Sequence, residues 1–335
     1  MPQEGSPVFF CPFPSRISPH AEEVRQKSAR WVIEHRLVAS DEKSHERLQK
    51  MGFGLLAARA YPMAPLEALE LTADWVSWLF LFDDCCDEMA PGRSPDGLHE
   101  LQKHLHAAVH REKLTPEAPP IALALRDVLQ RIEERGLEET SSRFRRNVID
   151  YLAANRWEAH NRSRNIVPRL SDYCAMRPLT GAVYSCFELL DITDGIRLPP
   201  EVRAHPDLKL LERSANSIIC WCNDVLSVEK EMRHGDVHNL VLAIQHELNC
   251  ALPEAIDRAV KIHNTEVHAF VELAARRARF DSVTEAHLER YIAGLSSWIR
   301  ANLDWSLTAV RYQTPVGSES KRICDPRPGP LPPSP

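Results

Sequence analysis

Glycine is scarce in this sequence, with 12 residues among 335, and short runs of β-branched residues that alternate with turns are missing. The second absence argues against a β-sheet. The long segments are instead rich in Ala, Leu, Glu and Arg, which are among the residues that form helices most readily. We therefore predict an all-α protein of about ten helices.

Further absences narrow the class of protein. No window approaches the roughly 18 apolar residues of a membrane span, and the N-terminus MPQEGSPVFFCPFPSR lacks the features of a secretory signal. A formal net charge of −6 argues against nucleic-acid binding. The nine cysteines are scattered without a CxxC pair, which disfavours a zinc site or a disulfide framework. We expect a cytoplasmic protein with buried free thiols.

The organisation along the chain predicts one main domain. Residues 1–20 hold five prolines and three phenylalanines, typical of an extended strap across helices, and the proline-rich residues 315–335 should be disordered. Between them, residues 21–314 form the helical domain. Apolar residues recur at intervals of three and four in segments 21–36, 65–82, 97–110, 121–136, 141–166, 208–234, 239–249, 252–279 and 283–312.

The segment FLFDDCCDE (80–88) runs from apolar residues into four acids, with no Lys or Arg among them. Asp83 and Asp87 share one face of a helix, and so do Asp84 and Glu88. Each like-charged pair destabilises the helix by roughly 0.2–0.5 kcal/mol, and the dipole disfavours anions at a helix C-terminus. A divalent cation such as Mg²⁺ would resolve both problems. For this motif alone, a solvated acidic helix end is an equally good interpretation.

A second polar group lies in CNDVLSVEKEMRHGDVHNLV (222–241). Asn223, Ser227 and Glu231 fall at positions i, i+4 and i+8, which places three oxygen-bearing side chains on one helix face. Asn and Ser are poor residues for a helix interior, so this stripe favours joint ligation of a cation over a merely polar face. Lys230 adds a cation suited to a phosphate.

These two motifs, about 140 residues apart, resemble the aspartate-rich and NSE metal motifs of class I terpene synthases. NDxxSxxKE at 223–231 resembles bacterial members in particular, and FFCPFPSRISPHA resembles their proline-rich N-terminal strand. The resemblance covers roughly residues 8–315. It implies an α-helical bundle around a central active-site cavity.

The resemblance also implies further site residues. Arg177, 46 residues before Asn223, matches the arginine that senses the diphosphate, followed by Thr180 as linker and Gly181 as effector. Asp is frequent at the linker position, so Thr180 is a departure. Arg311 and Tyr312 match a pair that binds the same diphosphate. DDCCDE satisfies both DDxxD and DDxxxE, which leaves open whether Asp87 or Glu88 is the second metal-facing acid.

Aromatic side chains could stabilise a carbocation through the ring quadrupole, although each one alone is more often plain core. Phe80, three residues before Asp83, is the first candidate, and Trp298 and Trp305 come second. The other candidates for the cavity wall are Phe53, Trp75, Trp78 and Phe187.

The implied function is that of a carbon–oxygen lyase: a Mg²⁺-dependent terpene cyclase of bacterial secondary metabolism. Three Mg²⁺ ions and a farnesyl diphosphate substrate are expected, with a sesquiterpene hydrocarbon or alcohol as product, and the resemblance allows a homodimer. Geranyl or geranylgeranyl diphosphate are alternative substrates. A chain-elongating prenyl diphosphate synthase would need a second DDxxD in place of NDxxSxxKE. A non-catalytic metal-binding helical protein would leave Arg177, Arg311 and Tyr312 unexplained.

Replacement of a residue in the second motif separates a catalytic role from a structural one. We expect Asn223→Ala or Glu231→Ala to abolish turnover of the prenyl diphosphate, because each removes a metal ligand, while helical content measured by circular dichroism stays intact. Loss of folding in either variant would mean that the polar stripe is structural.

Overall fold

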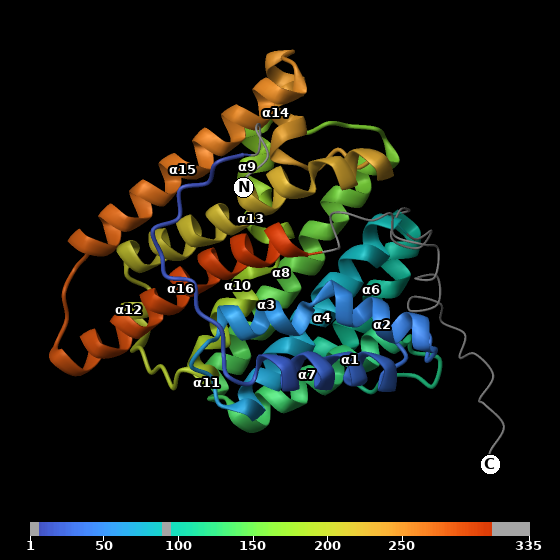
Figure 1. The fold of residues 1–335 in the computed structure, drawn as a ribbon. Helices are drawn as coiled ribbons and strands as arrows, with labels where there is room; N and C mark the ends of the chain where they lie inside the picture. Colours follow the sequence, from blue (N-terminus) through green and yellow to red (C-terminus); the bar gives the residue numbers. More distant parts are fainter. Residues whose placement is uncertain (1–6, 89–94, 310–335) are drawn as a thin grey trace.

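The computed structural model describes residues 7–88 and 95–309, and every regular element in these residues is an α-helix (Figure 1), which confirms the predicted class. The helices are α1 (Ala21–Glu34), α2 (Glu42–Met51), α3 (Phe53–Ala60), α4 (Leu66–Glu88), α6 (Pro95–Val109), α7 (Pro120–Arg135), α8 (Glu138–Ser163), α9 (Leu170–Thr180), α10 (Val183–Glu188), α11 (Leu190–Thr193), α12 (Pro200–Arg203), α13 (Pro206–His234), α14 (Leu240–Leu248), α15 (Leu252–Arg276) and α16 (Ser282–Thr308).

The described residues hold 15 helices, more than the predicted number of about ten, because short helices escaped the periodicity argument. Helix α3 reads FGLLAARA and is apolar on nearly every side, since α1, α4 and α16 all pack against it. In α3, a Cβ on Gly54 would lie 2.8 Å from the Arg25 Cα, so glycine permits the close approach of α1. Helix α9 carries Pro178 inside it, a residue that normally ends a helix.

Helix α4 is a central element of the bundle. Both sides of it are covered, so its sequence is apolar almost all round rather than amphipathic. The fully buried Trp75 and Trp78 satisfy their indole N–H groups by donating to the Ser185 hydroxyl at 3.0 Å and the Ile121 carbonyl at 2.8 Å. The second central helix, α13, packs against α9, α10, α14, α15 and α16.

Residues 7–20 run as extended chain along α15 and over α16 before α1 begins (Figure 1). The Asn264 side chain accepts a hydrogen bond from the Phe10 N–H at 2.8 Å and donates one to the Val8 carbonyl at 3.1 Å. The Phe13 ring packs edge-on against Phe270. The division of the chain at residue 20 stays a prediction, and residues 315–335 lie outside the described residues.

The segment from α10 to α12 is held by buried ion pairs. The Asp191 carboxylate accepts hydrogen bonds from Arg143 at 2.6 Å, from Thr140 at 2.8 Å and from Arg203. Arg143 also pairs with Glu188 at 2.7 Å. Two arginines therefore share two carboxylates, and each charge has a partner, which buried charges require. These pairs fix α10 and α11 against α8.

Seven of the eight cysteines in the described part of the chain are free thiols, as predicted, but only four of these seven are buried. The prediction was wrong for Cys85, which is disulfide-bonded. Among the described residues, no helix combines the length and the apolar character that a membrane span requires.

Candidate active site

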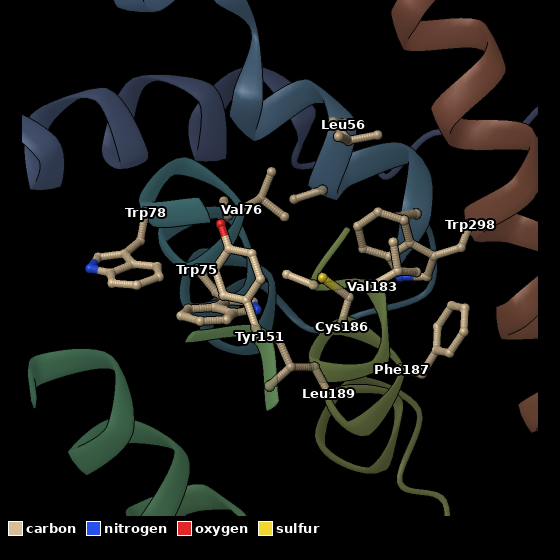
Figure 2. Close-up of a cluster of buried hydrophobic side chains, with 14 of the residues drawn as sticks. Leu56, Trp75, Val76, Trp78, Tyr151, Val183, Cys186, Phe187, Leu189 and Trp298 are labelled. Carbon is tan, nitrogen blue, oxygen red and sulfur yellow. The ribbon is translucent and has the colours of Figure 1, made fainter. Parts of the chain in front are cut away.

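A cavity that is partly open to solvent, with about 660 Å³ of empty space in and in front of it, lies between α3, α4, α8, α9, α10, α13 and α16. Much of its wall is apolar, with Leu56, Val76, Val183, Cys186 and Trp298 contributed by four helices (Figure 2). The same wall also carries the polar side chains Asp83, Tyr151, Arg177, Thr180, Asn223 and Asn302. The cavity therefore joins an apolar chamber to charged groups, the combination that ligand sites use.

Arg177 reaches the cavity from α9, near the end of that helix. Its Nε donates to Asp224 Oδ1 at 2.9 Å, and its Nη2 lies 2.8 Å from the same oxygen and 3.1 Å from Asn223 Oδ1. Burial is the largest single effect and disfavours the charged form, but Asp224 and the neighbouring Tyr173, Cys220 and Glu231 together outweigh it, so the pKa of Arg177 is raised well above its usual value. A permanent positive charge is thus held at the cavity wall.

Asp224 is fully buried, and sequence reasoning assigned it no role. Its Oδ2 accepts hydrogen bonds from the Tyr173 hydroxyl at 2.6 Å and from the Leu240 N–H at 3.1 Å. Tyr173 precedes Arg177 by four residues, so both face α13. In the sequence, this tyrosine and arginine at positions i and i+4 were the feature that could have predicted a buried carboxylate facing α9.

Asn223, Ser227 and Glu231 lie on one stripe of α13, as the spacing predicted. The Ser227 hydroxyl donates to Glu231 Oε1 at 2.6 Å, and Asn239 donates to Glu231 Oε2 at 2.7 Å. Burial above all, and then the negative charges of Asp224 and Asp236, raise the pKa of Glu231 to about 8. A carboxyl group in this state is one that a bound cation would ionise.

The two leading acids of DDCCDE lie differently. Asp83 lines the cavity, one turn beyond Phe80. Asp84 is buried and pairs with Lys230 Nζ at 3.4 Å, and Lys230 is not among the described residues that line the cavity. The side chains of Asp87 and Glu88, and the residues Arg311 and Tyr312, lie outside the part of the chain that can be described.

Between α9 and α10 the chain breaks at the cavity wall. Gly181 keeps a right-handed conformation, and the next residue, Ala182, takes φ 56°, a left-handed conformation that is strained for alanine. Among the described residues, no hydrogen bond reaches the carbonyls of Thr180 or Gly181. Free acceptors at a cavity wall are available to a positively charged ligand.

Of the aromatic candidates, Phe80 and Trp298 line the cavity. The Phe80 ring stacks on Phe53 at 4.8 Å between centroids and tilts against Trp305 at 5.0 Å. Trp75 and Trp78, by contrast, are not among the lining residues and stack on each other within the hydrophobic core (Figure 2).

A cation site has to be judged from the donor set. In the described residues, no three His, Cys, Asp or Glu side chains meet as a ready metal centre. The stripe on α13 instead offers amide, hydroxyl and carboxylate oxygens, with Ser227 and Glu231 already in contact. Oxygen donors of this kind suit a hard divalent cation, so the residues present fit a metal.

Comparison with known proteins gives a consistent result. A family model described as "Terpene synthase family 2, C-terminal metal binding" matches residues 74–269. The chain is 46% identical to a (+)-T-muurolol synthase ((2E,6E)-farnesyl diphosphate cyclizing) of Roseiflexus castenholzii, over 93% of this chain and 95% of that one. It is 33% identical to a germacrene A synthase of Nostoc punctiforme, over 91% and 94% of the two chains.

Solved structures agree. The crystal structure of an α-eudesmol synthase superposes with a TM-score of 0.80 at 26% identity, covering 90% of this chain and 99% of that chain. A linalool/nerolidol synthase from Streptomyces clavuligerus gives a TM-score of 0.78 at 25% identity, covering 89% of this chain and all of the other.

The helix break leads to a stability prediction. A Cβ at position 181 would lie 2.4 Å from the Cys220 Sγ, so Gly181→Ala must displace the thiol or the backbone. We expect it to lower the free energy of unfolding by about 1–3 kcal/mol, the usual cost of overpacking. The double variant Gly181→Ala/Cys220→Ala should recover most of the loss in urea unfolding, relative to Cys220→Ala alone. Equal losses in both backgrounds would contradict this packing.

Proposed function

The chain belongs to the class I terpene synthases, and we propose that it ionises farnesyl diphosphate and cyclises it to a sesquiterpene, with release of diphosphate. The observation that carries this proposal is that Asp83, Arg177 and Asn223 meet an apolar wall in the same cavity. Such a cavity can hold a charged head group and a hydrocarbon chain together. The curated relatives named for farnesyl diphosphate support a C15 substrate.

The metal ligands in this proposal are Asp83 on α4 and Asn223, Ser227 and Glu231 on α13. Divalent metal use follows from the family, and we propose Mg²⁺, with three ions as the family resemblance implies. Bound there, Mg²⁺ would neutralise negative charge on the leaving diphosphate. Asp87 or Glu88 would complete the acidic side, and which of them does so stays a prediction.

The diphosphate would be held mainly by Arg177. Its guanidinium is charged at any physiological pH and is already aimed at the cavity wall beside Asn223. Charge-assisted hydrogen bonds from such a group strengthen as negative charge develops on the leaving oxygen. Arg311 and Tyr312 are proposed to bind the same diphosphate. Lys230 forms an ion pair with Asp84, so we propose that its main role is to connect α4 to α13. Any contact of Lys230 with the diphosphate would be made while it keeps this ion pair.

The rest of the cavity would control the allylic cation. Its apolar residues exclude bulk water, which delays quenching, and the chain folds against them. Phe80 lines the cavity and its ring would face the cation, and the carbonyl of Gly181, which accepts no hydrogen bond from the described residues, would stabilise it. A hydrocarbon forms when a proton is lost, and an alcohol forms when a water molecule attacks.

The direct test is incubation with C10, C15 and C20 prenyl diphosphates and Mg²⁺, followed by gas chromatography of the extract. We expect a cyclic C15 product from farnesyl diphosphate, and loss of that product when EDTA removes the metal, because ionisation needs the neutralised diphosphate. Absence of a terpene from all three substrates would refute the proposed function, and a product from the C10 or C20 substrate alone would correct the chain length.

A further inference from the structure

The polar stripe of α13 extends beyond its proposed metal ligands. Asn216 and Cys220 precede Asn223 by seven and three residues, so they continue the same helix face two turns and one turn earlier, respectively. Asn216 is completely buried. Its amide Nδ2 donates to the Pro178 carbonyl of α9 at 2.9 Å, and its Oδ1 accepts a hydrogen bond from the Cys220 thiol at 3.2 Å.

The helix break explains why α9 needs this contact. In a regular helix the Pro178 carbonyl would accept from the N–H four residues later, that of Ala182. Ala182 has left the helix with φ 56°, and its N–H turns to the Leu179 carbonyl instead, at 3.4 Å. The Pro178 carbonyl therefore loses its partner within the chain segment, and Asn216 supplies the missing donor.

Cys220 contacts the same break at two other points. Its Sγ lies 3.8 Å from the Arg177 carbonyl and occupies the space beside Gly181 that a side chain would need. Asn216 and Cys220 thus touch the residue that senses the diphosphate, the residue after it and the effector position. Asn216 itself is not among the residues that line the cavity.

We propose that Asn216 and Cys220 are positioning residues that lock the break between α9 and α10 to the metal-binding helix α13. This inference rests on the proposed function. In this role the two residues keep the Gly181 carbonyl oriented toward the cyclising cation. They can do so because one rigid helix, α13, carries both the proposed metal ligands and the residues that support the break. Product distribution, rather than ionisation, depends on Asn216.

The variants Asn216→Leu and Asn216→Ala test this inference. Both remove the donor to the Pro178 carbonyl: leucine keeps the branched shape of asparagine at a larger volume, and alanine removes the side chain without adding a polar group. The matched control is Gln102→Met. Gln102 is equally buried and donates its amide to the Leu152 carbonyl of α8 at 2.6 Å, away from the break. Each enzyme is incubated with farnesyl diphosphate and Mg²⁺, and diphosphate release, product ratios and Tm are measured.

We expect all three variants to lose a few degrees in Tm, since each removes a buried hydrogen bond from a side-chain amide to a backbone carbonyl. Diphosphate release per folded enzyme should stay within about threefold of the unsubstituted protein. In the Asn216 variants, the share of acyclic and early-terminated products should rise at least threefold, whereas Gln102→Met should keep the original ratio.

An unchanged product ratio in a folded Asn216 variant would overturn the inference and leave a purely structural hydrogen bond. The same holds if Gln102→Met shifts the ratio as strongly. Should Asn216→Leu fail to fold, the smaller Asn216→Ala decides by the same ratio. If the unsubstituted protein makes no terpene from farnesyl diphosphate while its Tm is normal, the proposed function fails instead, which is a distinct result.

Discussion

The buried ion pair between Arg177 and Asp224 is the interaction on which the rest of the site depends. Asp224 is completely buried, and its carboxylate accepts hydrogen bonds from Arg177 and Tyr173 of α9 and from the Leu240 N–H at the start of α14. A buried carboxylate without such partners would cost several kcal/mol, on the order of the whole stability margin of a protein. Removing either partner would therefore weaken the contact between α9 and α13 and leave the other charge buried without its partner.

Two consequences follow from that pair. It places a permanent cation beside Asn223, at the start of the proposed metal stripe. The ion pair also fixes the position of the last turn of α9 beside the cavity. The chain therefore leaves the helix at the cavity wall, where Ala182 takes its strained conformation. A strained backbone conformation of this kind persists only where contacts with the surrounding residues hold it in place. Here the Trp75 indole holds the Ser185 hydroxyl, which in turn donates to the Ala182 carbonyl at 2.6 Å, while Asn216 holds the other side.

The parts of this account that sequence could supply are those with helical spacing. The i, i+4, i+8 arrangement of Asn223, Ser227 and Glu231 needs nothing but the geometry of one helix, and the structure places them as predicted. The split between Asp83 and Asp84 could not be predicted, because it depends on Lys230, which lies 146 residues away from Asp84 in the chain. Helix α3 and the break after α9 were missed for a related reason: tertiary packing, not periodicity, decides them. Asn216 has no local signal at all, since its partner is a carbonyl freed by that break.

The central claim is that Asp83, Arg177 and the stripe on α13 together form one site for a divalent metal and diphosphate. It is tested most directly by thermal unfolding with Mg²⁺ and inorganic diphosphate, alone and combined. A ligand that binds the folded state at 100 times its Kd adds about 2.7 kcal/mol, which would raise Tm by several degrees. The account predicts that the combined ligands raise Tm by more than the sum of their separate effects, and that Glu231→Gln removes this excess. Purely additive shifts, or the same excess in Glu231→Gln, would contradict it.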